Sequence, residues 1–211
     1  MDKIQLQEKK LYKIRKTCLE MLDDRKYVIS DIIKNISYDD FKKMFNNKNI
    51  DLKIVANDLE NIQEMERKNI YIHFQIDDTS FGKNDLKKII NDIYTKYETE
   101  DVLIILVLKD NPNTAVKKEL KNTKYKNIEV FERKNLEFNV SKHILIPKHI
   151  KLTKEQGQNV LDTYNCTLEQ LPKIFSSDPQ IKYHGMRVGD ICKIIRNTKE
   201  NGIDIAYKLV I

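Results

Sequence analysis

The most constraining feature of the sequence is one uninterrupted apolar run, VLIILVL, at positions 102–108. Seven residues are too few for a membrane-spanning helix, which needs about 20. A short apolar run rich in Val and Ile is typical of a strand that is buried on both faces. We therefore expect a sheet whose central strand is covered on both sides.

The neighbouring segments show the alternating spacing of strands and the helical spacing expected of helices that cover a sheet. Apolar residues at every second position predict strands within 50–54 and 70–76. Helical spacing predicts an amphipathic helix over 8–24, a short one at 41–45 behind Ser37, and a longer one over 86–97. A helix near 112–121 and a strand at 128–131 complete the pattern. The prediction is an α+β fold that begins with a mixed-sheet α/β domain.

Glycine and proline are concentrated in the last third of the chain, where all but Gly82 and Pro112 lie at or after residue 147. This change in composition predicts two domains, 1–142 and 143–211, the second being a small α+β domain. In it, capping boxes at 153–156 and 167–170 predict helix starts, and 178–185 has the signals of a short helix. An Asn201-Gly202 turn would join strands at 191–195 and 203–210 into a hairpin.

The spacing of Gly185 and Gly189 raises the possibility of a phosphate-binding loop. Such a loop leads from a strand into a helix, with its amide groups converging on the anion. Here Asp190 and a predicted strand follow the second glycine. We favour a helix-ending glycine and a turn glycine that lead into a hairpin.

The sequence contains no motif that predicts catalysis or metal binding. Its three cysteines and four histidines are too far apart for known zinc spacings, so buried thiols and hydrogen-bonded or surface histidines are expected. A metal-dependent nuclease would need carboxylates at the ends of adjacent strands. Asp101 and Asp110 flank the apolar run, but Val107 stands where the carboxylate two residues before Lys109 is required. We predict no catalytic residue, no metal and no cofactor.

Charge leaves two interpretations open. The 211-residue chain has a net charge of +6 and a pI near 9.0. Its densest basic patch comprises Lys117, Lys118, Lys121, Lys124 and Lys126, with Tyr125 among them. Such a patch either contacts DNA phosphates without distinguishing bases or is a solvated helix face. The N-terminus has no secretory-signal pattern, so an intracellular protein is expected.

Three stretches of the C-terminal third resemble a known family. LIPKHIKLT (145–153), QLPKIFSSDPQIKYHGMRVGDICKIIR (170–196) and the final AYKLVI resemble the assembly domain of the fifth shared subunit of eukaryotic nuclear RNA polymerases. Archaeal polymerases have a counterpart of this assembly domain that lacks the family's N-terminal jaw domain. LYKIRKTCLEMLDDRKY (11–27) is similar to the first helix of that jaw domain.

The resemblance implies a non-catalytic subunit of a multisubunit DNA-dependent RNA polymerase, an enzyme only as part of that complex. Its C-terminal domain would dock on the largest polymerase subunit among the other subunits, and its jaw domain would line downstream duplex DNA, with no membrane involved. The implied assembly-interface residues are Pro147, Lys148, His149, Asp178, Pro179, Tyr183, Gly185, Gly189 and Arg196. The implied DNA-contact residues are Asn111, Asn113, Thr114, Lys117, Lys118 and Lys121.

The chain also departs from the family. Val188 stands where the family often has a basic residue, and His184 where it often has an apolar or aromatic one. Abundant Lys, Asn and Ile indicate an AT-rich genome, either of a divergent cellular lineage or of a large DNA virus. The expected location is the nucleus for a cellular protein, or the host cytoplasm and virion for a viral one. The alternative function is a free-standing, non-specific DNA-binding protein.

Overall fold

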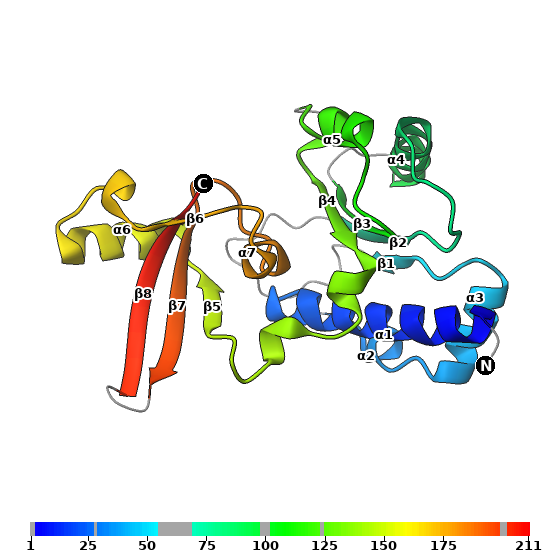
Figure 1. Cartoon of the computed structure of the whole chain (residues 1–211), viewed down its shortest axis with the longest axis horizontal. Helices are drawn as coiled ribbons and strands as arrows, with labels where there is room; N and C mark the ends of the chain where they lie inside the picture. The colour runs from blue at the N-terminus through cyan, green and yellow to red at the C-terminus, as the bar shows by residue number, and fades with distance from the viewer. Residues whose placement is uncertain (1–2, 28, 55–68, 98–101, 123–124, 199–201) are drawn as a thin grey trace. The chain divides into compact units, whose positions relative to one another are not determined.

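The computed structural model describes residues 3–27, 29–54, 69–97, 102–122, 125–198 and 202–211. It divides into two compact units, Met1–Phe138 and Asn139–Ile211, which we call the N-terminal and C-terminal units (Figure 1). This division falls four residues before the boundary expected after residue 142. Both units combine helices with sheets, which confirms the predicted α+β class.

The N-terminal unit is built on a four-stranded mixed sheet in the order β1-β2-β3-β4. Its strands are β1 (Leu52–Ile54), β2 (Asn69–Phe74), β3 (Val102–Leu108) and β4 (Ile128–Glu132). β1 is antiparallel to β2, whereas β2, β3 and β4 run parallel. Every residue of β3 is buried, as the apolar run predicted. β2 ends at Phe74, two residues before the predicted end, and the side chain of Gln75 makes polar contacts.

Helices cover both faces of this sheet (Figure 1). α4 (Lys83–Tyr97) and α5 (Thr114–Leu120) follow β2 and β3 in the chain. They pack on one face through Leu86, Ile90, Ile93 and Val116, against alternate residues of β3. α1 (Lys3–Asp24) lies along the other face and buries Ile14, Cys18, Met21 and Leu22 completely. The two helical layers make β3 the doubly covered strand.

The remaining helices of this unit are short. α3 (Tyr38–Asn46) begins behind Ser37 as predicted, because the Ser37 side chain accepts a hydrogen bond from the Asp40 amide. α1 begins at Lys3, five residues earlier than its apolar spacing indicated. α2 (Asp31–Lys34) and the 3-10 turn η3 (Arg133–Leu136) were not predicted.

The C-terminal unit contains a second four-stranded sheet in the order β5-β7-β8-β6. The long β7 (Ile191–Thr198) and β8 (Gly202–Val210) form the predicted antiparallel hairpin. The other elements are η4 (Val140–Lys142), β5 (Lys148–Lys151), α6 (Lys154–Tyr164), η5 (Leu168–Gln170), β6 (Lys173–Ile174) and α7 (Pro179–Tyr183). β5 and β6 were not predicted, because they are short and gain their hydrogen bonds only from the hairpin.

Two apolar clusters hold this unit together. Ile181, Met186, Cys192, Ile194 and Val210 form one, and Leu171, Ile191 and Leu209 form the other. α6 approaches the sheet closely, since a Cβ at Gly157 would lie 3.1 Å from Ile191 Cδ1. The expectation of three buried thiols was wrong for Cys166, which is half-buried. Within the described ranges, no helix combines the length and apolar character needed to span a membrane.

Candidate functional site

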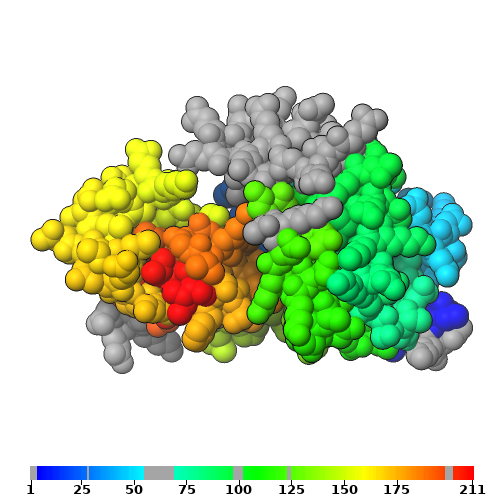
Figure 2. Space-filling view, turned by 90° about the horizontal axis from the view of Figure 1, so that it is seen from above, coloured from blue at the N-terminus to red at the C-terminus, as the bar shows by residue number. Residues whose placement is uncertain are grey.

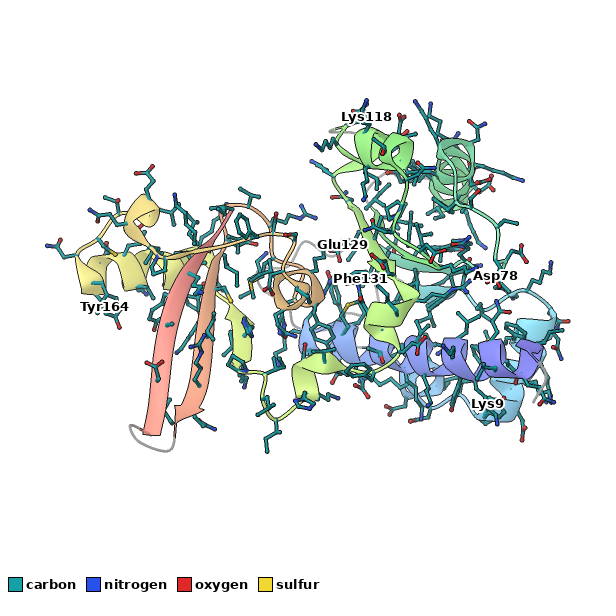
Figure 3. The ribbon with its side chains drawn as sticks, viewed as in Figure 1. Lys9, Asp78, Lys118, Glu129, Phe131 and Tyr164 are labelled. Atoms are coloured by element: carbon teal, nitrogen blue, oxygen red, sulfur yellow. The ribbon has the colours of Figure 1, made fainter. Side chains whose placement is uncertain are left out.

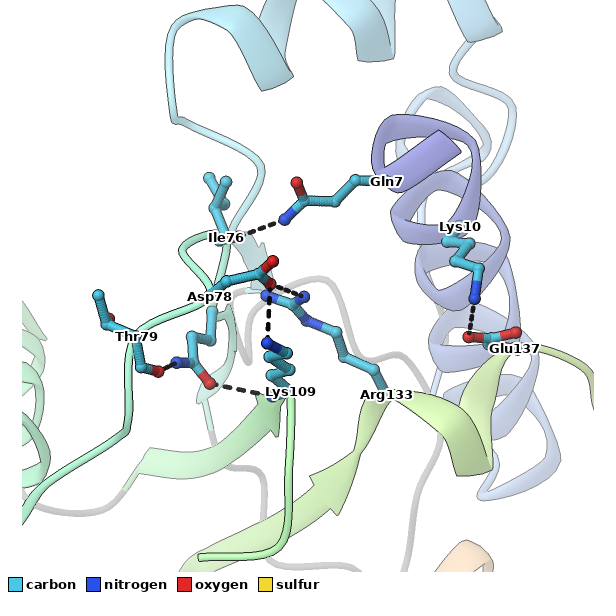
Figure 4. Close-up of polar contacts among 9 residues, drawn as sticks. Gln7, Lys10, Ile76, Asp78, Thr79, Lys109, Arg133 and Glu137 are labelled. Carbon is cyan, nitrogen blue, oxygen red and sulfur yellow. Dashed lines mark hydrogen bonds and ion pairs between the residues drawn. The ribbon is translucent and has the colours of Figure 1, made fainter. Parts of the chain in front are cut away.

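The carboxyl ends of β2 and β3 are joined by one side chain (Figure 4). Gln75 donates a hydrogen bond from Nε2 to the Thr79 carbonyl at 2.7 Å. Its Oε1 accepts a hydrogen bond from the Lys109 amide at 2.9 Å. This edge of a parallel sheet is where α/β proteins commonly bind ligands, so its charges decide what it can do.

Charges at this edge largely neutralise one another. Lys109 Nζ and Arg133 Nη1 lie 3.5 and 3.7 Å from Asp78 Oδ1. Burial lowers the pKa of Arg133, while the carboxylates of Asp78, Asp110 and Asp77 oppose this shift. Because Lys109 and Arg133 both pair with Asp78, the charges at this edge form an ion-pair network within the protein.

Of the residues considered for nuclease chemistry, those that the structure describes are not assembled into a metal site. Val107 is fully buried in β3, Lys109 pairs with Asp78, and Asp101 lies outside the described residues. Among the residues that are described, no group of three or more His, Cys, Asp or Glu side chains could hold a metal ion.

α5 presents the predicted basic surface, and Figure 2 shows this part of the chain in green. Asn113 begins the helix, because its Oδ1 accepts a hydrogen bond from the Val116 amide at 2.9 Å. Buried Val116 directs the opposite face of the helix to solvent, where Lys117, Lys118 and Lys121 are exposed. Figure 3 shows Lys118 pointing away from the body of the unit.

Glu119, the acidic residue within this patch, pairs with lysines of α4. Glu119 Oε2 lies 2.8 Å from Lys83 Nζ, and Glu119 Oε1 lies 3.5 Å from Lys87 Nζ, both on α4. The hydrogen bond from Lys83 is the main cause that lowers the pKa of Glu119. The α5 lysines therefore keep a positive surface that Glu119 offsets only weakly.

The other predicted members of the DNA surface differ in position. Asn111 and Thr114 are exposed at the start of α5, whereas the side chain of Asn113 caps the helix. Tyr125 is 8% exposed and belongs to the core, so its predicted place among the surface lysines was wrong. Lys124 lies outside the described residues.

Asp51 and His73 form a polar contact that the sequence did not reveal. The Asp51 carboxylate accepts hydrogen bonds from the Tyr71 hydroxyl at 2.7 Å, from His73 Nδ1 at 2.9 Å and from the Phe74 amide at 3.0 Å. These bonds tie the start of β1 to β2. His73 is thus a hydrogen-bonded histidine, as expected.

In the C-terminal unit, the glycine-rich stretch forms turns and not a phosphate loop. Asp178 caps α7 by accepting hydrogen bonds from the Gln180 and Ile181 amides, with Pro179 at the first helical position. Gly185 and Gly189 then adopt φ angles of 61° and 95°, which favour glycine. β7 follows directly, as the turn hypothesis predicted.

The predicted assembly residues converge on α7 and the adjoining strands. His149 is buried on β5, and its Nδ1 donates a hydrogen bond to the Pro147 carbonyl at 2.8 Å. Burial lowers the pKa of His149. The charge of Asp178 opposes this shift, whereas the charges of Arg196 and Lys208 add to it. These groups therefore lie close together in one unit.

The same residues differ in exposure, and Pro147, Asp178 and Gly185 among them are half-buried. Tyr183 is buried, and its hydroxyl accepts a hydrogen bond from Asn139 Nδ2 at 2.8 Å. Ser141 Oγ donates to Gln180 Oε1 at 2.8 Å, so the start of the unit is tied to α7 at two points. The exposed members of the predicted set are Lys148, Pro179, Gly189 and Arg196. The buried members build the fold that presents the exposed ones.

These features define a two-unit α+β protein, in which one unit presents exposed lysines on a short helix and the other is a small module built around a long hairpin. Two family models match the chain: "RNA polymerase Rpb5, N-terminal domain" over residues 5–93 and "RNA polymerase Rpb5, C-terminal domain" over residues 138–210. The chain belongs to this RNA polymerase Rpb5 family.

Two relatives match along nearly the whole chain, and a third matches 34% of it. The "DNA-directed RNA polymerases I, II, and III subunit rpabc1" of Dictyostelium discoideum is 30% identical over 205 residues, covering 96% of this chain and 98% of that protein. The corresponding subunit of Caenorhabditis briggsae is 28% identical over 212 residues, covering 98% of each. "DNA-directed RNA polymerase subunit Rpo5" of Methanocaldococcus jannaschii is 44% identical over 72 residues, which cover 34% of this chain and 92% of that protein.

Proposed function

We propose that this chain is a non-catalytic subunit of a multisubunit DNA-dependent RNA polymerase. Residues 143–211 act as the assembly domain that docks on the largest subunit, and residues 1–142 act as the jaw domain along downstream duplex DNA. The observation that carries the proposal is the match to a shared polymerase subunit over 98% of that relative's length.

The C-terminal unit is the better supported docking element. The M. jannaschii polymerase subunit matches only 72 residues of this chain, yet this is 92% of its own length. The C-terminal family model has a similar extent, residues 138–210. A polymerase subunit little longer than this unit supports placing the assembly role there.

The basic face of α5 supports the DNA-facing role of the N-terminal unit. Lys117, Lys118 and Lys121 are exposed, and Glu119 is engaged by α4. Exposed lysines on a helix neutralise backbone phosphates without distinguishing bases, as a subunit that guides moving DNA requires. The same surface favours the alternative, a free-standing non-specific DNA-binding protein.

The location follows from the assembly. We place a cellular copy in the nucleus, as expected for relatives of polymerases I, II and III. A virus-encoded copy would act in the host cytoplasm and be packaged in the virion.

The deciding experiment is mass spectrometry of the proteins that co-purify, in moderately high salt, with a tagged copy expressed in its native source. We expect two very large polymerase subunits in amounts equal to the tagged chain. Recovery of DNA without those subunits would replace the proposal with the free DNA-binding protein. Recovery of neither polymerase subunits nor DNA would contradict both the proposed function and the alternative.

A further inference from the structure

α4 and α5 are joined both in the core and near their first turns. Leu86 and Ile90 of α4 and Val116 of α5 belong to one buried apolar cluster. Just before the two helices, Asn113 Nδ2 donates a hydrogen bond to the Phe81 carbonyl at 3.4 Å. The starts of the helices therefore lie side by side, and their exposed side chains border one another on the solvent side.

Two lysines of α4 meet the single carboxylate of α5 on this solvent side. Lys83 Nζ lies 2.8 Å from Glu119 Oε2, and Lys87 Nζ lies 3.5 Å from Glu119 Oε1. Both lysine side chains are 46% exposed, whereas that of Glu119 is 16% exposed. An ammonium group has three N–H donors, so each lysine can still bond to an acceptor from solvent. Because two positive charges face one negative charge, the contact remains positive.

The acidic residues of α4 lie on another side of the helix. Lys83 and Lys87 are four positions apart and share the face that meets Glu119. At about 100° per residue, Asp85 and Asp92 lie on nearly the opposite side from that face. Asp85 also caps the helix start, because its Oδ2 accepts a hydrogen bond from the Gly82 amide at 2.8 Å. The side of α4 next to α5 is therefore basic.

This basic side adjoins the exposed lysines of α5. Glu119 follows Lys118 directly in α5 and contacts both α4 lysines, so it connects the two sets. The α5 helix of seven residues is only about 10 Å long, and packed helices lie about 8–10 Å apart. Adding the α4 lysines about doubles the width over which the unit can reach phosphates of a duplex. We call the combined set the α4–α5 surface: Lys83, Lys87, Lys117, Lys118 and Lys121.

We propose that the DNA-contacting surface of the N-terminal unit extends from α5 onto the start of α4, where Lys83 and Lys87 bind backbone phosphates of duplex DNA. Ammonium groups of this kind neutralise phosphates without distinguishing bases. The extension rests on the proposed function, under which this unit lines downstream DNA. The sequence placed these contacts on α5 and the residues before it, because the pairing of Glu119 with α4 has no local signal.

The test is lysine acetylation of the polymerase complex that a tagged copy recovers, measured with and without a duplex DNA template. Peptide mass mapping gives the rate at each lysine. An amine that is bound to a phosphate is shielded from the reagent, so DNA should slow the acetylation of Lys83 and Lys87 at least about threefold, together with the α5 lysines. Lys9, Lys13 and Lys42 on α1 and α3 are also exposed and should react at the same rate with and without DNA.

The contrary results separate this extension from the proposed function. Protection of the α5 lysines by DNA, with unchanged rates at Lys83 and Lys87, would overturn the extension and leave the proposed function intact. Rates at Lys83 and Lys87 that are already low without DNA would show that another subunit covers them, which also overturns it. No effect of DNA on any lysine of the α4–α5 surface would contradict the DNA-facing role itself. Failure to recover any polymerase subunit would contradict the proposed function.

Two double variants of the purified full chain test the same point without the complex. Lys83→Gln with Lys87→Gln should reduce the slope of log K against log salt for a mixed-sequence duplex by up to about 1.8, at roughly 0.9 for each phosphate contact. Lys9→Gln with Lys42→Gln removes the same charge from α1 and α3 and should leave the slope unchanged. Circular dichroism checks that both variants fold. Equal slopes for the two variants would contradict the proposal.

Discussion

Arg25 Nη2 lies 2.8 Å from Glu129 Oε2, an ion pair that joins the chain just after α1 to β4. The Arg25 side chain is only 3% exposed, whereas that of Glu129 is 22% exposed. A second ion pair, nearer the surface, joins α1 to the chain just after η3, where Lys10 Nζ lies 3.0 Å from Glu137 Oε1 (Figure 4). The second pair is the more exposed, since its two side chains are 49% and 38% exposed.

This difference predicts unequal costs for two similar substitutions. Glu129→Ala should lower the free energy of unfolding by about 2 kcal/mol, because it removes the carboxylate from a buried guanidinium. Glu137→Ala should cost less than about 1 kcal/mol, since exposed ion pairs contribute little. Urea unfolding followed by far-ultraviolet circular dichroism measures both. Equal costs would show that burial does not set the strength of these pairs.

The lysine surface of α5 predicts a charge-specific loss of DNA binding. Replacing Lys117, Lys118 and Lys121 with glutamine should weaken duplex binding at low salt and reduce the slope of log K against log salt by up to about 2.7, at roughly 0.9 for each phosphate contact. The control replaces Lys9, Lys13 and Lys42 on α1 and α3, which are also exposed. A control that loses as much affinity would show that only net charge matters.

The cap of α7 predicts a local stability effect in the C-terminal unit. Asp178→Ala should destabilise the unit by about 1 kcal/mol, because it leaves the Gln180 and Ile181 amides without their acceptor. Asp178→Asn keeps a capping oxygen and should cost less. Amide exchange of α7 in the full chain reports the effect. Unchanged exchange of Ile181 in Asp178→Ala would contradict it.

His149 predicts a pH dependence of stability. Because burial lowers its pKa in the folded chain, the unfolded chain binds a proton more readily as the pH falls. The stabilising contribution is present above the unfolded pKa, about 6.5, and is lost as the pH falls through the lower folded value. His149→Gln should therefore show a smaller loss of unfolding free energy between pH 7.5 and 5. Identical pH profiles would exclude this contribution.

The cysteines predict an order of chemical modification. Burial raises the pKa of Cys18 to about 12 and that of Cys192 to about 11, and both thiols are buried. Cys166 is half-buried. Because only an accessible thiolate reacts, iodoacetamide at about pH 8 should modify Cys166 first. Peptide mass mapping measures the order, and prior labelling of Cys18 would contradict it.

Elements with a strong local pattern were predictable. The run at 102–108 is β3, and the capping box at Thr153 begins α6, because burial and capping impose residue types that sequence shows directly. β5 and β6 were missed because they have four and two residues, with pairing partners far along the chain. Tyr125 was misplaced since a residue among lysines has no local signal that separates core from surface.

By itself, the sequence determined the secondary structure of the longer elements, the turn role of Gly185 and Gly189, and the resemblance to a polymerase subunit family. These properties depend on neighbouring residues or on their order, which the chain carries without folding. Only the tertiary structure decided that Glu119 bonds to α4 and leaves the α5 lysines exposed, and that β6 pairs with the end of β8. Both depend on which segments meet in space, and contacts between distant residues exist only once the chain has folded.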